Sequence, residues 1–148
     1  MIHKSDILTL EKVEQDFRII KSFYFSEVSY DDNGKKFDLY LMTNEKVILE
    51  KQIKIYNELI KNFNKYLIEI NDFIESTYSK YERKNLEKLN NSKLNIYVIS
   101  IPYNKENFEA VLVCGKQYKL FGFFKKDITI RVEFKDGKIN SIERKSDT

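Results

Sequence analysis

The chain has 148 residues, of which 42% are hydrophobic, and its 26 basic and 23 acidic side chains give a formal net charge of +3. This length fits one domain spanning residues 1–148, and the apolar fraction argues against disorder. A single histidine, His3, and a single cysteine, Cys114, are too few for a zinc site or for a Ser-His-Asp or Cys-His catalytic set. We therefore expect no cofactor, no metal site and no enzymatic activity.

Neither a membrane-spanning segment nor a secretion signal is evident in the sequence. No apolar run approaches the roughly 18 residues that a membrane helix needs. Residues 1–6, MIHKSD, lack the apolar stretch of a signal peptide. We therefore expect a cytoplasmic protein with no membrane among its partners.

The first third of the chain is expected to form strands. Thr9–Val13 is a short candidate, and Phe17–Tyr24 is rich in aromatic and branched residues. A hairpin is expected next, because Asn33-Gly34 stands between alternating apolar residues and favours a two-residue type I′ turn.

This turn fixes a register for the predicted hairpin. It places Val28 opposite Leu39 and Tyr30 opposite Phe37, on one apolar face. The other face then carries Phe25, Glu27, Tyr40 and Met42. An exposed group of aromatic and Met side chains bordered by an acid is typical of a protein-binding patch, so we predict that these four residues bind a partner.

The middle of the chain switches to helical spacing. Apolar residues recur every three or four positions over residues 49–78, without a Gly or Pro. We expect one long or kinked helix, or a helix pair, from about Asn44 to Asn90, with Asn62 and Asn64 marking a kink or a break. The apolar stripe is broad and aromatic, which favours packing on a sheet over a dimeric coiled coil. Ile60 and Leu67 are expected to be buried in it.

The last third of the chain returns to strand patterns. Strands are expected over Asn95–Ile101, Glu109–Cys114, Tyr118–Phe124 and Asp127–Phe134. A second type I′ turn at Asp136-Gly137 would place Phe134 opposite Ile139. The order of strands, helix and strands predicts an α+β fold, in which the helix or helix pair packs on one face of a mainly antiparallel sheet.

The remaining groups that could carry chemistry have simpler interpretations. Glu106 and Glu109 lie three residues apart and keep a carboxylate-based hydrolase open as an alternative. Asp31 and Asp32 fit turn chemistry better. Cys114 follows an apolar run, so we expect a buried and inert thiol.

Basic and aromatic residues interleave near the C-terminal strands. Lys119, Phe121, Phe123 and Lys125 could form a stacking platform for nucleic acid. However, residues 125–145 hold seven basic and four acidic side chains, which favours a solvated face of mixed charge. We therefore predict no nucleic-acid partner.

The order of elements resembles that of a group of small bacterial α+β domains of unknown function, some of which act as immunity proteins against polymorphic toxins. The similarity rests on Lys36–Met42 leading into a long helix, on Phe121–Phe124, and on Ile128–Phe134 followed by Asp136–Ile139. It implies a binding protein with no catalysis of its own, and no functional residue of that group can be matched here. We therefore predict an immunity protein that occludes a toxin. A self-associating structural domain, present as a homodimer, is the alternative, and a hydrolase using Glu or Asp ranks third.

Overall fold

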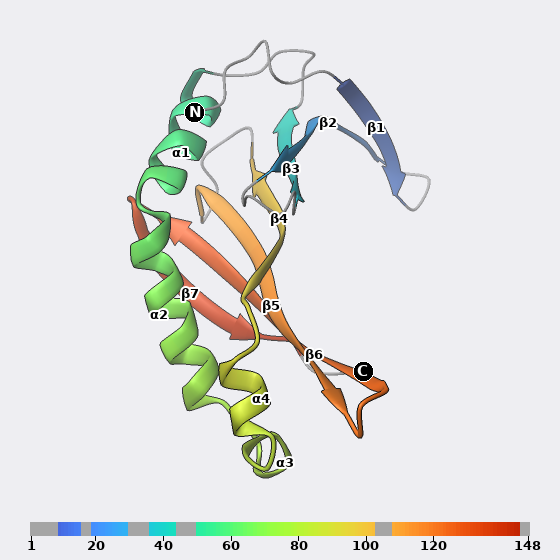
Figure 1. Ribbon diagram of the computed structural model, residues 1–148. Coiled ribbons are helices and arrows are strands. Elements are labelled where there is room, and N and C mark those ends of the chain that lie inside the picture. The colour runs from blue at the N-terminus through green and yellow to red at the C-terminus, as the bar shows by residue number, and fades with distance from the viewer. Residues whose placement is uncertain (1–8, 16–18, 30–35, 44–49, 103–107, 146–148) are drawn as a thin grey trace.

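The computed structural model describes residues 9–15, 19–29, 36–43, 50–102 and 108–145. In this part of the chain a sheet of seven strands, β1 to β7 in sequence order, is accompanied by four helices (Figure 1). The strands are β1 (Thr9–Gln15), β2 (Ile19–Ser29), β3 (Lys36–Thr43), β4 (Asn95–Ile101), β5 (Ala110–Leu120), β6 (Phe124–Lys135) and β7 (Lys138–Arg144). All neighbours are antiparallel except β3 and β4, which confirms the α+β class with a mainly antiparallel sheet.

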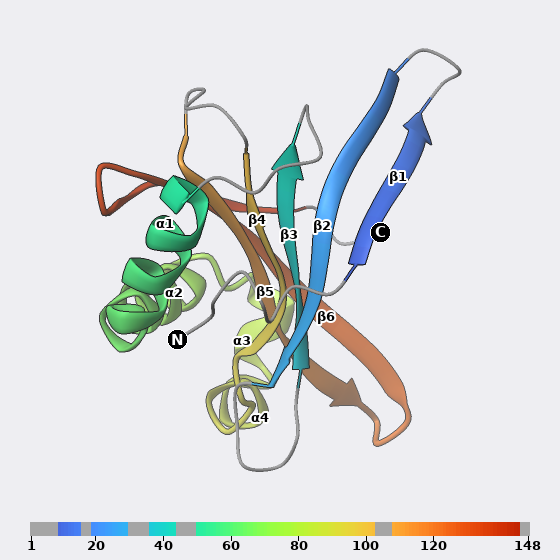
Figure 2. The same ribbon diagram turned by 90° about the horizontal axis from the view of Figure 1, so that it is seen from above.

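The helices form the connection between β3 and β4. They are α1 (Glu50–Lys61), α2 (Phe63–Ser76), α3 (Lys80–Arg83) and α4 (Leu86–Asn90). Parallel neighbours need a crossover of about a dozen residues or more, and this helical segment supplies it. Figures 1 and 2 show α1 and α2 running along one side of the sheet. The expected helix start at Asn44 lies outside the described residues, whereas the expected end at Asn90 is observed.

The core is one cluster of buried side chains that come from the strands and the helices. Phe37, Leu39 and Leu41 alternate along β3 and are at most 2% exposed. They share one cluster of buried side chains with Ile70 and Ile74 of α2, neither of which is exposed at all. The period of two in the strand and the period of about 3.6 in the helix therefore meet in the same core.

At two positions of the helical apolar stripe, one on α1 and one on α2, the buried residue is the one before the residue that the spacing predicts. Ile60 is 36% exposed, so the prediction of its burial is wrong, while Leu59 is only 4% exposed. Likewise Tyr66 is 4% exposed and Leu67 is half-buried. Successive helix residues point about 100° apart, and the sequence has apolar side chains at both positions of each pair. The pattern alone therefore left the centre of the buried face undetermined.

The register of β2 against β3 also differs from the prediction. Val28 pairs with Phe37 rather than with Leu39, a shift of two residues. The last pair before the connection is Ser29 with Lys36, so six residues separate the paired ends, and the Asn33-Gly34 turn lies outside the described residues. A shift of two keeps each residue of β3 on its predicted face, because side chains alternate with a period of two.

The C-terminal strands confirm one predicted turn and correct another. At the confirmed turn Phe134 pairs with Ile139, and Asp136 and Gly137 have φ of 53° and 72°, as a type I′ turn requires. The strand predicted over Tyr118–Phe124 is wrong, because the chain turns over residues 121–123. A single long β5 replaces the two shorter strands expected there, and β2 likewise runs unbroken to Ser29.

Candidate functional site

The predicted partner-binding patch lies on β2 and β3, and two of its four side chains belong to the described part of the structure. Tyr40 and Met42 are half-buried and alternate along β3 with the core residues. Phe25 pairs in register with Tyr40, and Glu27 pairs with Asp38. The side chains of Phe25 and Glu27 lie outside the described part of the structure. The backbone of all four residues therefore meets on β2 and β3, with Tyr40 and Met42 as the described side chains.

The face that carries Tyr40 continues across the sheet, and we call it the outer face. The register aligns Tyr40 with Ser100 of β4, and Asp38 with Val98 of β4. Val98 in turn pairs with Val113 of β5. All five side chains are half-buried, so the outer face presents apolar and polar groups together.

Arg131 and Glu133 give the outer face charge on β6. They form an ion pair with each other. The Arg131 guanidinium carbon also lies 5.6 Å from the centre of the Phe108 ring, a cation–π contact that holds the side chain over an aromatic surface. Since Val113 pairs with Arg131, the charged part of the face borders its apolar part.

Gln52 of α1 ties the helix to the end of β3 and β4. Its side chain is 1% exposed, and Nε2 donates to the carbonyl oxygens of Met42 at 2.7 Å and of Ile101 at 3.3 Å. A buried amide must find such partners, because burial without them is costly. The backbone at Met42 is therefore held by Gln52, which lies ten residues away in the chain. The sequence analysis did not identify this residue.

The β5–β6 hairpin ends in a second notable surface, which we call the tip (residues 119–126). Phe121, Phe123 and Phe124 are 76%, 71% and 55% exposed. Lys119 and the adjacent pair 125–126 flank them and are exposed too. Figure 1 shows this hairpin extending away from the body of the protein. Three exposed aromatic side chains in one turn exceed the scattered apolar residues of an ordinary surface.

The backbone of the tip is strained. Phe121 has φ of 52°, and Gly122 follows with φ of 80°. Gly tolerates this left-handed region, but a bulky side chain there costs about 1–2 kcal/mol. Asn, Asp or Gly would suit position 121 better, so the phenylalanine is held there at the expense of stability.

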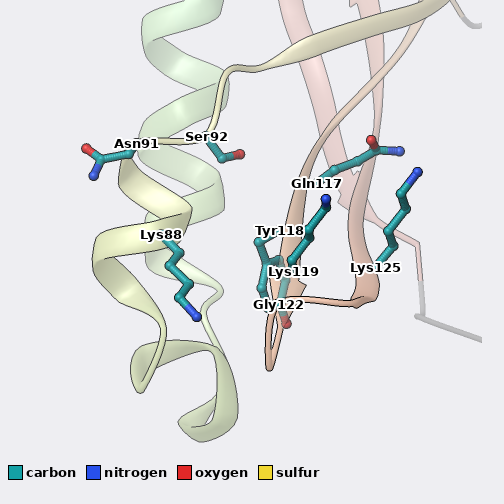
Figure 3. Close-up of a pocket in the computed structure, with 8 residues that line it drawn as sticks. All are labelled: Lys88, Asn91, Ser92, Gln117, Tyr118, Lys119, Gly122 and Lys125. Atoms are coloured by element: carbon teal, nitrogen blue, oxygen red, sulfur yellow. The ribbon is translucent and has the colours of Figure 1, made fainter.

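A cavity of about 590 Å³ lies between the hairpin and α4. Its lining includes Lys88, Ser92, Lys119 and Lys125 (Figure 3). The Lys88 side chain extends from α4 toward the hairpin, whereas Lys125 lies on the hairpin's other side. The Ser92 hydroxyl is shielded from solvent and has no hydrogen-bond partner among the described residues. The ammonium groups of Lys88 and Lys119 make the lining cationic, which suits an anionic group.

The buried carboxylate Glu82 serves structure. It is 2% exposed, and its two oxygens accept from Arg144 Nη1 at 2.8 Å and Nη2 at 2.6 Å. The Ser79 amide donates to Glu82 Oε1 at 2.8 Å, while Ser79 Oγ accepts from the Glu82 amide, which completes a capping box. Burial raises the pKa of Glu82, but the hydrogen bonds and charge of Arg144 and the bonds of Ser79 outweigh it and leave this pKa lowered.

Two further buried ionisable groups among the described residues are Cys114 and Lys116. Cys114 is fully buried, and burial raises the pKa of its thiol to about 12, which keeps it protonated. Lys116 is 6% exposed, and burial lowers its pKa against the opposing charge of Glu75. His3 and Glu106 lie outside the described residues.

In the described part of the chain, no group of three or more His, Cys, Asp or Glu side chains could hold a metal ion. In the same ranges no helix has the length and apolar character needed to cross a membrane.

Comparison with known proteins gives no relative. No protein-family model, no curated protein and no solved structure matches this chain significantly. Any functional conclusion therefore rests on the chain's own residues.

Sequence signals for these features differ in strength. Ser79 and Glu82 stand in the S-x-x-E spacing of a capping box, which reading the sequence could have identified. Gly122 is a turn signal. The strand propensity of the phenylalanines around it outweighed this signal in the prediction of a strand over these residues. The bond between Glu82 and Arg144 joins residues 62 positions apart and has no local signal.

Proposed function

We propose that this chain is a non-catalytic cytoplasmic protein that acts by binding another protein, a toxin that it occludes, through the outer face of its sheet. One observation carries the proposal. Tyr40 and Met42 alternate with the core of β3 yet remain half-buried, beside Val98 and Val113. Interface cores are enriched in aromatic residues and Met, and a charged rim such as Arg131 is typical of their border.

Among the described residues the buried acid, Glu82, is held in structural contacts, which supports a binding role over catalysis. Among those residues the buried polar side chains are Gln52, Glu82 and Lys116. Gln52 donates to backbone carbonyls, and Glu82 is engaged by Arg144 and Ser79. A hydrolase needs carboxylates that are available to substrate, so the geometry favours it least.

We also propose that α1 and α2 act as one kinked helical layer on the inner face of the sheet. The Tyr66 ring lies 5.0 Å from the Phe134 ring, centre to centre, in an edge-on arrangement. Ile53 of α1 belongs to the same buried cluster as Ile99 and Ile101 of β4. Such a layer would leave the outer face as the side available to a partner.

The test is binding to the protein encoded by the neighbouring gene. The two proteins are co-expressed, and affinity is measured by calorimetry for the wild type and for Tyr40→Ala. Loss of an aromatic hot spot should weaken binding by about 30-fold, equivalent to about 2 kcal/mol. Tyr81→Ala is the matched control, because this tyrosine is 49% exposed on α3 and should leave the affinity unchanged.

Two results would count against this proposal. If Tyr40→Ala binds as tightly as the wild type, the outer face is not the site. If the wild type binds no neighbour and sediments as a concentration-dependent dimer, the self-association alternative replaces it.

A further inference from the structure

The tip of the β5–β6 hairpin combines two properties that the outer face lacks. Its three phenylalanines, Phe121, Phe123 and Phe124, are largely exposed, and the rings of Phe123 and Phe124 lie 4.5 Å apart, centre to centre. Residues 116–126 include four lysines and no acidic residue. The tip is thus apolar at its end and cationic on its flanks.

The shape of the tip limits what it can bind. It extends from the body as a hairpin, so its phenylalanines form a protrusion and not a groove (Figures 1 and 2). A flat stacking platform for nucleic acid would need aromatic rings on the face of the sheet, whereas Phe121 and Phe123 lie in the turn. The tip is a protrusion with an apolar end and cationic flanks. It is therefore complementary to a layered surface that has an anionic outer layer and an apolar layer beneath it.

We propose that the tip inserts into the interface of a membrane that contains anionic lipids. The three phenylalanine side chains enter the boundary between headgroups and acyl chains, where aromatic rings are favoured. Lys119, Lys125 and Lys126 stay at the headgroup level and attract the lipid phosphates. This is contact at the membrane surface, which needs no membrane-spanning helix, and it departs from the expectation, drawn from the sequence, of no membrane partner.

The cavity beside the tip supports an anionic lipid as the occupant. It lies between α4 and the hairpin, and Lys88 extends from α4 toward the tip (Figure 3). Its volume of about 590 Å³ falls in the range of small-molecule sites and can receive a phosphate headgroup.

A fluorescent reporter tests insertion directly. The chain has no tryptophan, so Phe123→Trp introduces a single reporter at the tip. Its emission should shift to the blue, and acrylamide quenching should fall, with vesicles containing about 30% phosphatidylserine in phosphatidylcholine. Ile68→Trp, on α2, is the matched control and should show neither change, because that side chain is 65% exposed on a different element.

Co-sedimentation with the same vesicles measures how much the phenylalanines and the lysines of the tip each contribute to membrane binding. Replacing all three tip phenylalanines by Ser should weaken binding at least tenfold, while Ile68→Ser, at a 65% exposed position on α2, should not. Lys119→Gln, Lys125→Gln and Lys126→Gln should each cost about fivefold at low salt, and the exposed lysine substitutions Lys54→Gln and Lys65→Gln should cost less. Circular dichroism should confirm that every variant is folded.

The proposal is overturned if folded Phe123→Trp shows no change with anionic vesicles, or responds equally to vesicles of phosphatidylcholine alone. It is also overturned if the reporter responds to single-stranded RNA or to an acidic protein but not to vesicles. Because the tip and Tyr40 lie on different elements, these results are independent of the toxin-binding test.

Discussion

The hydroxyl of Tyr66 donates a hydrogen bond to the carbonyl oxygen of Gly137 at 2.7 Å, joining residues 71 positions apart in the chain. It links α2 to the turn between β6 and β7, while the ring of the same tyrosine packs against Phe134. One side chain therefore attaches the helix to the turn through both polar and apolar contacts.

Tyr66→Phe separates the two contacts. It keeps the ring against Phe134 and removes only the hydroxyl, so the free energy of unfolding should fall by about 0.5–1.5 kcal/mol. Chemical denaturation measures this change. Tyr81→Phe, whose side chain is 49% exposed, should be neutral, and an equal loss in both variants would contradict the role of the Gly137 bond.

Leu59→Ala and Ile60→Ala test which side of α1 faces the core. Leu59 is 4% exposed and Ile60 is 36% exposed. Removing the buried side chain should cost about 2–5 kcal/mol in unfolding free energy, whereas the exposed one should cost less than about 1 kcal/mol. Urea denaturation of the two variants gives the comparison, and a larger loss for Ile60→Ala would reverse the assignment of the buried face.

Gly115→Ala should be unusually disruptive for so small a change. A Cβ at this position would lie 2.2 Å from the backbone carbonyl oxygen of Ile128, so β5 and β6 would have to separate. We expect a loss of about 2–3 kcal/mol or more in unfolding free energy. Gly122→Ala is the control, because its φ of +80° is strained but nothing lies within 4 Å. A loss at Gly115 no greater than at Gly122 would exclude a close approach of the strands.

The pair of Glu82 and Arg144 should make stability depend on pH in the acid range. Since the folded pKa of Glu82 lies below the ordinary value of 4.5, its contribution is present above pH 4.5 and is lost as the pH falls through the folded pKa. Glu82→Gln should remove this part of the acid dependence. Denaturation midpoints across the acid range measure it.

Arg144→Met gives the complementary result. It leaves the Glu82 carboxylate buried without its cation, so unfolding free energy at neutral pH should fall by about 3–5 kcal/mol. The matched substitution Lys145→Met removes an exposed charge next in sequence and should change little. Equal effects of the two variants would show that the buried pair does not support the fold.

Phe121→Asn should stabilise the protein. Asn tolerates the φ of 52° at this position better than Phe does, and the Phe121 side chain is 76% exposed. A gain of about 0.5–1 kcal/mol in unfolding free energy is expected. Phe123→Asn should bring no such gain, because the positive φ values fall on Phe121 and Gly122. A loss of stability in Phe121→Asn would mean that the ring packs within the protein.

Local signals predicted the parts of the fold that local chemistry decides. Asp136-Gly137 specified its own turn, since both residues adopt positive φ readily, and the register of β6 and β7 followed from it. Asn33-Gly34, a dipeptide of the same turn-forming kind, did not specify the register, because six residues separate the paired ends. A dipeptide decides a register only where the strands pair right up to it.

The candidate surfaces show the same division. The alternation of β3 predicted that Tyr40 lies away from the core, because a period of two assigns faces without knowledge of the partner strand. The exposed tip could not be predicted in this way, since phenylalanines such as Phe121 and Phe123 favour strands and their exposure depends on where the hairpin turns. The Gln52 bonds to β3 and β4 arise from tertiary packing alone.

The parallel pairing of β3 with β4 divides the sheet into two blocks of consecutive strands, β1–β3 and β4–β7. Strands within each block follow one another along the chain, whereas the residue pairs from Asp38–Val98 to Leu41–Ile101 join segments that the helical crossover separates. Tyr40 lies on this junction, paired with Ser100. A partner bound across this junction would contact both blocks of strands at once. Its binding would therefore stabilise the whole sheet against opening, as well as cover one side of it.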